Sequence, residues 1–255
     1  MDFAYTTEQE GIRQSIQSLM KDFPDEYWMK RDQAHEFPMD FHNAIAKAGY
    51  LGLVIPEEYG GSGLGITEAG IALMEVAASG ACFNGASSIH LSIFGINPVV
   101  KHGSEEMRRK YLPRVVSGDL HICFGVTEPD AGTDTTRIST RAVRDGDRYI
   151  INGKKVWLTK AGDSQKVLLL TRTTPLEECK KRTDGMTLFF ADLDPSAVTI
   201  RPISKMGRNA VASNEVFFDN LSVPAADLVG QEGRGFHHLL DGLNPERLLG
   251  SYEGI

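Results

Sequence analysis

Hydrophobic residues recur every three or four positions through the first half of the chain, which is the spacing of one buried helical face. Thr7 with Glu10 three residues later resembles a capping box, and it predicts the start of the first helix. Residues 89–100 are apolar enough to form a further buried helix. Four apolar stripes stand out: Ile12, Ile16 and Leu19; Phe41, Ile45 and Ala48; Ile71, Met74 and Ala77; and Met107, Tyr111 and Val115. We therefore predict an all-helical domain over residues 1–120.

The period changes near residue 121, where short runs rich in β-branched and aromatic residues replace the helical stripes. Asp145-Gly146 separates two such runs and is a strong hairpin signal, and Asn152-Gly153 predicts a second turn. The polar segment 174–184 is expected to form a mobile surface loop. The remaining strands are expected over 167–171, 186–193, 198–203 and 215–218. This pattern predicts an antiparallel β-barrel or sandwich domain over residues 121–232.

From Gly235 the spacing is helical again. Asn244-Pro245 is interpreted as an N-cap followed by proline in the first helical position, which starts a new helix close to Ile255. A helix so near the end of the chain has little to pack against. The sequence therefore predicts that residues 233–255 open a truncated C-terminal helical bundle, so that the fold class is α+β with several domains.

Composition excludes some classes of partner. The 255 residues carry a formal net charge of −7, which argues against nucleic acid, because phosphate binding needs a basic face. No apolar run approaches the ~20 residues of a membrane span, and no secretory signal is visible at the N-terminus. The 3 cysteines are widely spaced and form no CxxC pair, so neither a metal site nor a disulfide framework is predicted. A reducing, cytoplasmic compartment is expected, with the mitochondrial matrix as the alternative.

Two segments carry the strongest chemical signal. Residues 124–134 (FGVTEPDAGTD) combine a short apolar run with turn formers and small hydroxyl residues, and 155–159 (KVWLT) end a predicted strand with an aromatic residue and a hydroxyl. Together they resemble the flavin-contacting segments of the acyl-CoA dehydrogenase family. The segments 55–61 (IPEEYGG), 111–113 (YLP), 152–155 (NGKK), 215–219 (EVFFD), 223–224 (VP) and 233–236 (GRGF) extend the resemblance along the chain in the family's order.

The resemblance implies a fold, a cofactor and a reaction. Members have a helical domain, a middle β-domain and a four-helix bundle. They bind FAD and oxidise acyl-CoA thioesters of fatty acid or amino acid catabolism to trans-2-enoyl-CoA, passing electrons to an electron-transfer flavoprotein. A homotetramer is usual, and a truncated chain would need a complementing subunit. Two alternatives stay open: a flavin oxidase or monooxygenase of the same fold, and a non-catalytic truncated subunit or fragment.

The resemblance also implies the residues that contact the cofactor. A hydride acceptor is needed because no side chain can take a hydride, and a flavin needs hydrogen bonds at its ring edge in a flat, dry slot. The expected cofactor contacts are Phe124, Val126, Thr127, Gly132, Thr133, Trp157, Leu158 and Thr159. Thr133 is also expected to reach the CoA portion of the substrate. The alternative for the threonines is an ordinary turn or strand-end role, and for Trp157 a place in the core.

Removal of the substrate α-proton requires a carboxylate with a raised pKa in a dry pocket. Glu246 directly precedes Arg247, as the base does in the isovaleryl-CoA and long-chain branches of the family. In other branches the base lies further downstream, which would leave Glu246 as a first-turn carboxylate favoured by the helix dipole. A helix N-terminus would lower its pKa and burial would raise it. Asn244 and Arg247 are expected to contact the substrate, with a solvated surface arginine as the alternative for Arg247.

The sequence also predicts the surroundings of two other side chains. Lys160 stands where the family usually has asparagine, and we expect it to point to solvent rather than to act on the flavin. His90 lies in an apolar stretch and is expected to be packed in the core or to line a cavity, with a catalytic role as the alternative.

Overall fold

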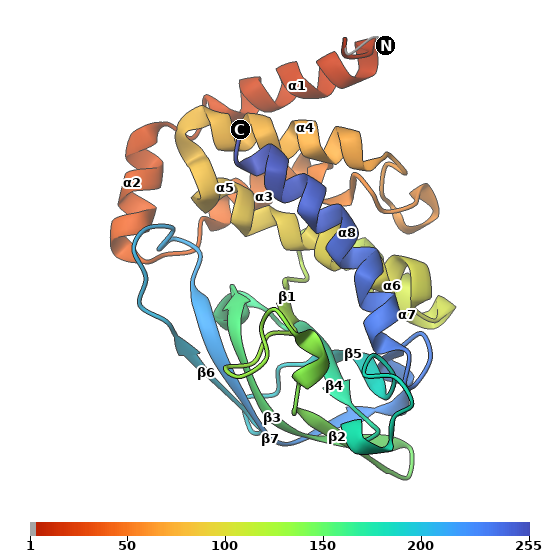
Figure 1. The fold of residues 1–255 in the computed structure, drawn as a ribbon. Coiled ribbons are helices and arrows are strands. Elements are labelled where there is room, and N and C mark those ends of the chain that lie inside the picture. The colour runs from red at the N-terminus through yellow and green to blue at the C-terminus, as the bar shows by residue number, and fades with distance from the viewer. Residues whose placement is uncertain (1–3) are drawn as a thin grey trace.

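The computed structural model describes residues 4–255 and places a layer of helices against a β-sheet domain (Figure 1). The last helix, drawn in blue, leaves the sheet domain and runs back across the first helices (Figure 1). The predicted fold class is therefore confirmed: helices first, a sheet in the middle and a helix at the end.

The helical layer contains seven helices of the described residues, and its first cap differs from the prediction. Thr6, not Thr7, is the N-cap. Its side-chain oxygen accepts a hydrogen bond from the backbone amide of Gln9, and the Gln9 side-chain oxygen accepts one from the backbone amide of Thr6. The helices are α1 (Thr7–Met20), α2 (Asp25–Ala34), α3 (Met39–Lys47), α4 (Ile66–Val76), α5 (Cys82–His90), α6 (Asn97–His102) and α7 (Glu105–Val116). The apolar stripes missed α2 because Trp28 is its only buried residue.

Helices α4, α5 and α6 form a nearly continuous helical run over Ile66–His102, interrupted by π-helical turns at Ala77–Ala81 and Leu91–Gly95. By length and composition alone this run could cross a membrane, and 44% of its most apolar window is buried inside the protein. Core helices pass the same test. Here the run packs against the first and last helices of the chain, so its apolar side chains fill the core that the helical layer encloses.

The β-domain is a single sheet of eight strands, most of them antiparallel. Its strands are β1 (Ile122–Gly125), β2 (Arg141–Asp145), β3 (Arg148–Thr159), β4 (Lys166–Arg172), β5 (Met186–Asp192), β6 (Val198–Pro202), β7 (Ser213–Pro224) and β8 (Leu228–Val229). Their order is β6-β7-β3-β2-β4-β5-β8, and β1 pairs with β4 in parallel. A short parallel contact also joins β2 to β4, so the sheet is not purely antiparallel as the sequence pattern predicted.

One predicted turn is confirmed and the other is wrong. Asp145-Gly146 does connect β2 and β3, and Arg144 pairs with Tyr149 across the hairpin. Asn152-Gly153 makes no turn, because β3 continues through it with a bulge between Ile151 and Gly153. Gly153 has a φ of 148°, and a Cβ there would lie 2.7 Å from the Thr140 backbone, so the bulge requires glycine.

Helix α8 (Gly235–Glu253) corrects the predicted start of the last helix. Asn244 is not an N-cap, and Pro245 lies inside one continuous helix. A proline there cannot donate to the carbonyl four residues earlier, which belongs to Asp241. The Asn97 side-chain amide of α6 donates to that carbonyl at 2.6 Å and replaces the missing backbone hydrogen bond.

The buried apolar residues form two separate cores. One joins the helical layer, the inner face of β4 and β5, and Leu239 and Leu249 of α8. The other lies within the β-domain and includes Leu158 and Val216. Because α8 contributes to the first core, it is held to both the helical layer and the sheet, and it closes one side of the space between them.

Candidate active site between sheet and helices

A cavity of about 330 Å³ opens where β1, β3, α5 and α8 meet. Its walls combine aromatic and aliphatic side chains with three threonines and a few charged groups. The lining residues are His90, Leu91, Phe94, Phe124, Val126, Thr127, Thr135, Val156, Trp157, Thr159, Arg208, Leu243 and Glu246. Of the residues predicted for a site, it brings together Phe124, Val126, Thr127, Trp157, Thr159 and Glu246.

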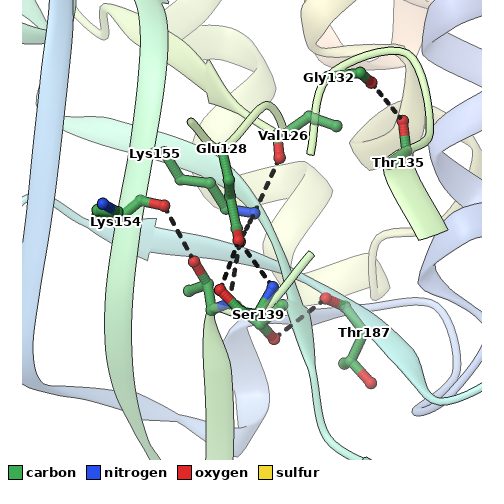
Figure 2. Close-up of polar contacts among 10 residues, drawn as sticks. Val126, Glu128, Gly132, Thr135, Ser139, Lys154, Lys155 and Thr187 are labelled. Carbon is green, nitrogen blue, oxygen red and sulfur yellow. Dashed lines mark hydrogen bonds and ion pairs between the residues drawn. The ribbon is translucent and has the colours of Figure 1, made fainter. Parts of the chain in front are cut away.

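The loop after β1 is fixed by a buried ion pair (Figure 2). The Lys155 ammonium lies 2.9 Å from a carboxylate oxygen of Glu128 and donates to the Val126 carbonyl at 2.9 Å. Glu128 also accepts hydrogen bonds from the backbone of Ser139 and Thr140. Burial alone would raise the pKa of Glu128, but the Lys155 charge and these hydrogen bonds lower it to about 2. The loop therefore holds Val126 and Thr127 in place on the cavity wall.

A second bulge in β3 turns Trp157 toward the cavity. The register against β7 shifts between Lys155 and Leu158, and Trp157 has a φ of 67°. Positive φ is unfavourable for a bulky residue, and such strain is found where the surrounding structure enforces it. The Val156 amide donates to the Thr127 carbonyl at 2.9 Å, which ties the two predicted segments together. The result is an indole side chain that is 60% exposed on the wall of a cavity.

The facing wall is made where α5 passes into its π-helical turn. The turn over Leu91–Gly95 widens the helix, so that His90, Leu91 and Phe94 all reach the cavity. Single π-helical turns occur frequently at functional sites. His90 is thus a cavity-lining histidine, as one of its two predicted roles required.

Glu246 reaches the cavity from the middle of α8. Burial raises the pKa of its carboxyl, and nearby His90 and Arg247 oppose that shift. Because α8 begins at Gly235, Glu246 lies about three turns into the helix and not at its N-terminus. The helix dipole therefore does not lower the pKa of Glu246, and burial determines the direction in which this pKa shifts.

Other predicted residues lie outside the cavity lining. Gly132 and Thr133 are exposed on the loop, Leu158 is fully buried in the β-domain core, and Asn244 and Arg247 are exposed on α8. The Arg247 guanidinium donates to the Asn244 side chain at 3.0 Å. Their predicted contacts stay predictions, and Leu158 can offer a ligand only its backbone.

Sequence reasoning missed two polar residues of the cavity. Thr135 lines it two residues after the predicted Thr133, where a short 3₁₀ turn begins. Arg208 enters from the connection between β6 and β7, and its guanidinium donates to the hydroxyls of Ser87 and Ser213. No motif drew attention to Arg208.

The prediction for Lys160 is wrong. Its side chain is fully buried, and its ammonium donates to the Ser88 carbonyl at 3.1 Å. Burial lowers the pKa of Lys160 to about 8. The lysine therefore links the end of β3 to α5 and is absent from the cavity lining. The cation that does line the cavity is Arg208.

Comparison with known proteins identifies the class. The model for the N-terminal domain of acyl-CoA dehydrogenases matches residues 6–119, and the model for the middle domain matches residues 123–221. Acyl-CoA dehydrogenase fadE12 of Mycobacterium bovis is 31% identical over 99% of this chain. The chain therefore belongs to the acyl-CoA dehydrogenase family.

Solved structures agree with this assignment. A glutaryl-CoA dehydrogenase of Mycobacterium smegmatis in complex with FADH2 is 26% identical, with a TM-score of 0.85 over 98% of this chain and 62% of that one. A chain from the structure of the electron-transferring flavoprotein of Acidaminococcus fermentans is 27% identical, with a TM-score of 0.89 over 99% of this chain and 66% of that one. This chain spans 64% of the length of the M. bovis relative.

Proposed function

We propose that this chain carries the flavin- and substrate-facing part of an FAD-dependent acyl-CoA dehydrogenase, which converts an acyl-CoA thioester to trans-2-enoyl-CoA. The observation that supports this most directly is the shared cavity. Thr127, Trp157 and Thr159 line one side, and Glu246, a carboxyl with a raised pKa, lines the other. A slot for a planar group and a base therefore face the same space.

The residues present fit a flavin ring. Trp157 offers a largely exposed indole on a strained bulge, and Thr127 and Thr159 offer hydroxyls beside it. Phe94 and Phe124 add aromatic rings to the lining of the same cavity, with ring centroids 6.4 Å apart. When bound, FAD supplies the acceptor for the hydride that leaves the substrate β-carbon.

Within this proposal Glu246 is the base. Its carboxylate would take the α-proton of the acyl group, and its raised pKa makes it a stronger base than an exposed glutamate. Arg247, exposed one residue later, would contact the CoA portion outside the cavity. The buried Glu128–Lys155 pair keeps the opposite loop rigid, so the distance between base and planar slot is fixed before substrate arrives.

The proposal extends to partners. We propose an electron-transfer flavoprotein as the electron acceptor, since a related fold occurs in the A. fermentans flavoprotein structure. We also propose a homo-oligomer, or a complementing subunit. Cys82, Cys123 and Cys179 are free thiols, which is compatible with the reducing cytoplasm that we propose as the compartment.

A flavin absorption spectrum during titration with a panel of acyl-CoAs tests the reaction. The purified chain is expected to be yellow or to take up FAD, and the preferred acyl-CoA is expected to bleach it. Peroxide formation without an added acceptor would indicate an oxidase or monooxygenase instead. A colourless chain that binds neither FAD nor acyl-CoA, alone or with its partner polypeptide, would contradict the proposal.

Substitution of the base gives a sharper test. Glu246→Gln is expected to retain FAD while the rate of bleaching falls by about 10²–10⁴-fold, the usual contribution of a positioned base. Glu26→Gln removes an exposed carboxylate from α2 and serves as the control, with bleaching unchanged. Full activity in Glu246→Gln would exclude Glu246 as the base.

A further inference from the structure

A buried histidine–carboxylate pair lies behind the proposed base. The Nδ1 atom of His90 is 2.9 Å from a carboxylate oxygen of Glu253, and the two side chains are only 13% and 4% exposed. His90 ends α5 and Glu253 ends α8, so the pair joins two helices 163 residues apart in the sequence. Neither residue of this pair belongs to the flavin-facing segments 124–134 and 155–159.

Glu253 determines which nitrogen of His90 carries the proton. A carboxylate accepts hydrogen bonds, so Nδ1 of His90 carries the hydrogen and donates it. In the neutral ring Nε2 is then an unprotonated acceptor. His90 lines the cavity while Glu253 does not, and Nε2 is the ring nitrogen that the contact with Glu253 leaves free for a group in the cavity.

Glu246 lies on the same face of α8 as Glu253, because seven residues make nearly two helical turns. It lines the cavity together with His90, and a positive charge on His90 lowers the pKa of Glu246. The other charges near Glu246 are Glu253, which raises that pKa, Arg247, which lowers it, and Arg208 on the cavity wall.

We propose that His90 is the proton acceptor for Glu246 and that Glu253 is its positioning residue, an inference that rests on the proposed dehydrogenation. The substrate α-C–H bond breaks and its proton forms an O–H bond on Glu246. The Glu246 O–H bond then breaks and the proton forms an N–H bond at Nε2 of His90. The Nδ1 hydrogen stays with His90, and Glu253 stabilises the resulting imidazolium. Glu246 is thereby returned to its carboxylate form.

The tautomer of His90 can be measured without cofactor or turnover. Long-range ¹H–¹⁵N correlation spectra of the chain labelled with [¹⁵N]histidine, assigned with His90→Gln, are expected to show hydrogen on Nδ1 and none on Nε2. Glu253→Leu is expected to abolish that preference. His102→Gln is the matched control, since His102 also contacts an α8 carboxylate, Asp241, at 2.7 Å but lies outside the cavity. Hydrogen on Nε2 of His90 in the unsubstituted chain would overturn the proposal.

Single and repeated turnover separate proton acceptance from a structural role. In the FAD-loaded protein, His90→Gln is expected to bleach in the first turnover within about 2-fold of the parent, while steady-state turnover falls by about 10-fold or more, within the range of general acid–base effects. Glu253→Gln, which retains an oxygen acceptor for His90, is expected to lose less than Glu253→Leu. Equal losses of rate in the first turnover and in steady state, or no loss of rate in steady state, would overturn this proton relay from Glu246 to His90. No bleaching in the parent would overturn the proposed function and the relay with it.

Discussion

At the scale of single residues, the decisive property is which charged side chains are buried. Lys155 and Lys160 are close in sequence and both fully buried, yet one holds a carboxylate and the other a backbone carbonyl. Lys154, next to the first of them, is exposed. Burial makes a partner obligatory, because an unpaired buried charge is expensive.

Removing the Lys155 charge is expected to destabilise the fold. Lys155→Met leaves Glu128 buried without its cation, and loss of one partner of a buried pair costs about 3–5 kcal/mol. Urea unfolding followed by circular dichroism measures the change, and Lys154→Met is the neighbouring control, with an expected change of less than about 0.5 kcal/mol. Equal stability in both variants would show that the pair does not hold the loop.

The same pair sets an acid limit on stability. The pKa of Glu128 is lowered from 4.5 to about 2, so its contribution is complete above pH 4.5 and is lost as the pH falls toward 2. Glu128→Gln is therefore expected to be less stable than the parent at pH 6, with the difference shrinking below pH 4.5. Unfolding curves at pH 6, 4 and 3 test this, and a constant difference would contradict it.

Residue types and their order identified residues on both sides of the cavity. Thr127, Trp157 and Thr159 line one side and Glu246 lines the other, because the family pattern fixes chemistry at positions along the chain. The environment of Lys160 was missed, because a lysine at a strand end is usually solvated and only the packing of α5 over β3 buries it. Arg208 was missed for the related reason that an irregular connection carries no periodic signal.

At the scale of elements, α8 contains a proline that the rest of the fold accommodates. Asn97→Ala removes the donor to the Asp241 carbonyl that Pro245 leaves free, and an unsatisfied buried acceptor costs about 1–3 kcal/mol. In a Pro245→Ala background the new backbone amide can satisfy that carbonyl. The cost of Asn97→Ala is then expected to fall by at least half.

A double-mutant cycle measured by chemical denaturation tests this coupling between α6 and α8. The two single variants and the double variant are compared with the parent under the same conditions. Additive effects of the two substitutions would mean that Asn97 stabilises α6 independently of the proline.

Local sequence signals identified elements but did not always distinguish a turn from a bulge or a helix start from a helix interior. Asp145-Gly146 and Asn152-Gly153 are similar signals, yet only the first reverses the chain, because β7 pairs with β3 on both sides of the second. Asn244-Pro245 likewise has the composition of a helix start. Contacts with distant elements decided both structures: β7 pairs with β3 on both sides of Asn152-Gly153, and α6 donates a hydrogen bond to α8 near Pro245.

At the scale of the whole molecule, Lys160 connects the sheet domain to the helical layer. Burial lowers the pKa of Lys160 from 10.5 to about 8, so the folded state releases its proton more readily than the unfolded state. The cost of burying the charge is present below pH 8 and disappears as the pH rises to 10.5. The parent is therefore expected to gain stability relative to Lys160→Met between these values. A parallel pH dependence of the two proteins in urea unfolding would contradict this.

The return of α8 to the first helices could not be predicted from periodicity, which describes only local structure. The sequence predicted a terminal helix with little to pack against, whereas Leu239 and Leu249 are buried in the core of the helical layer. Gly70 of α4 lies so close to Tyr252 that a Cβ would approach the ring to 2.5 Å. Such a contact depends on the path of the intervening sheet, and no short segment encodes it.

The position of α8 also has a consequence for biosynthesis. Helix α4 ends at Val76 and α8, which packs against it, begins only at Gly235, so a ribosome must add the whole β-domain before the part of α4 that faces α8 is covered. At about 5–20 residues per second this interval lasts on the order of ten seconds. During that time the nascent chain presents an apolar helical surface that a chaperone can bind. Protection of this surface during translation is therefore expected to raise the yield of folded protein in a cell.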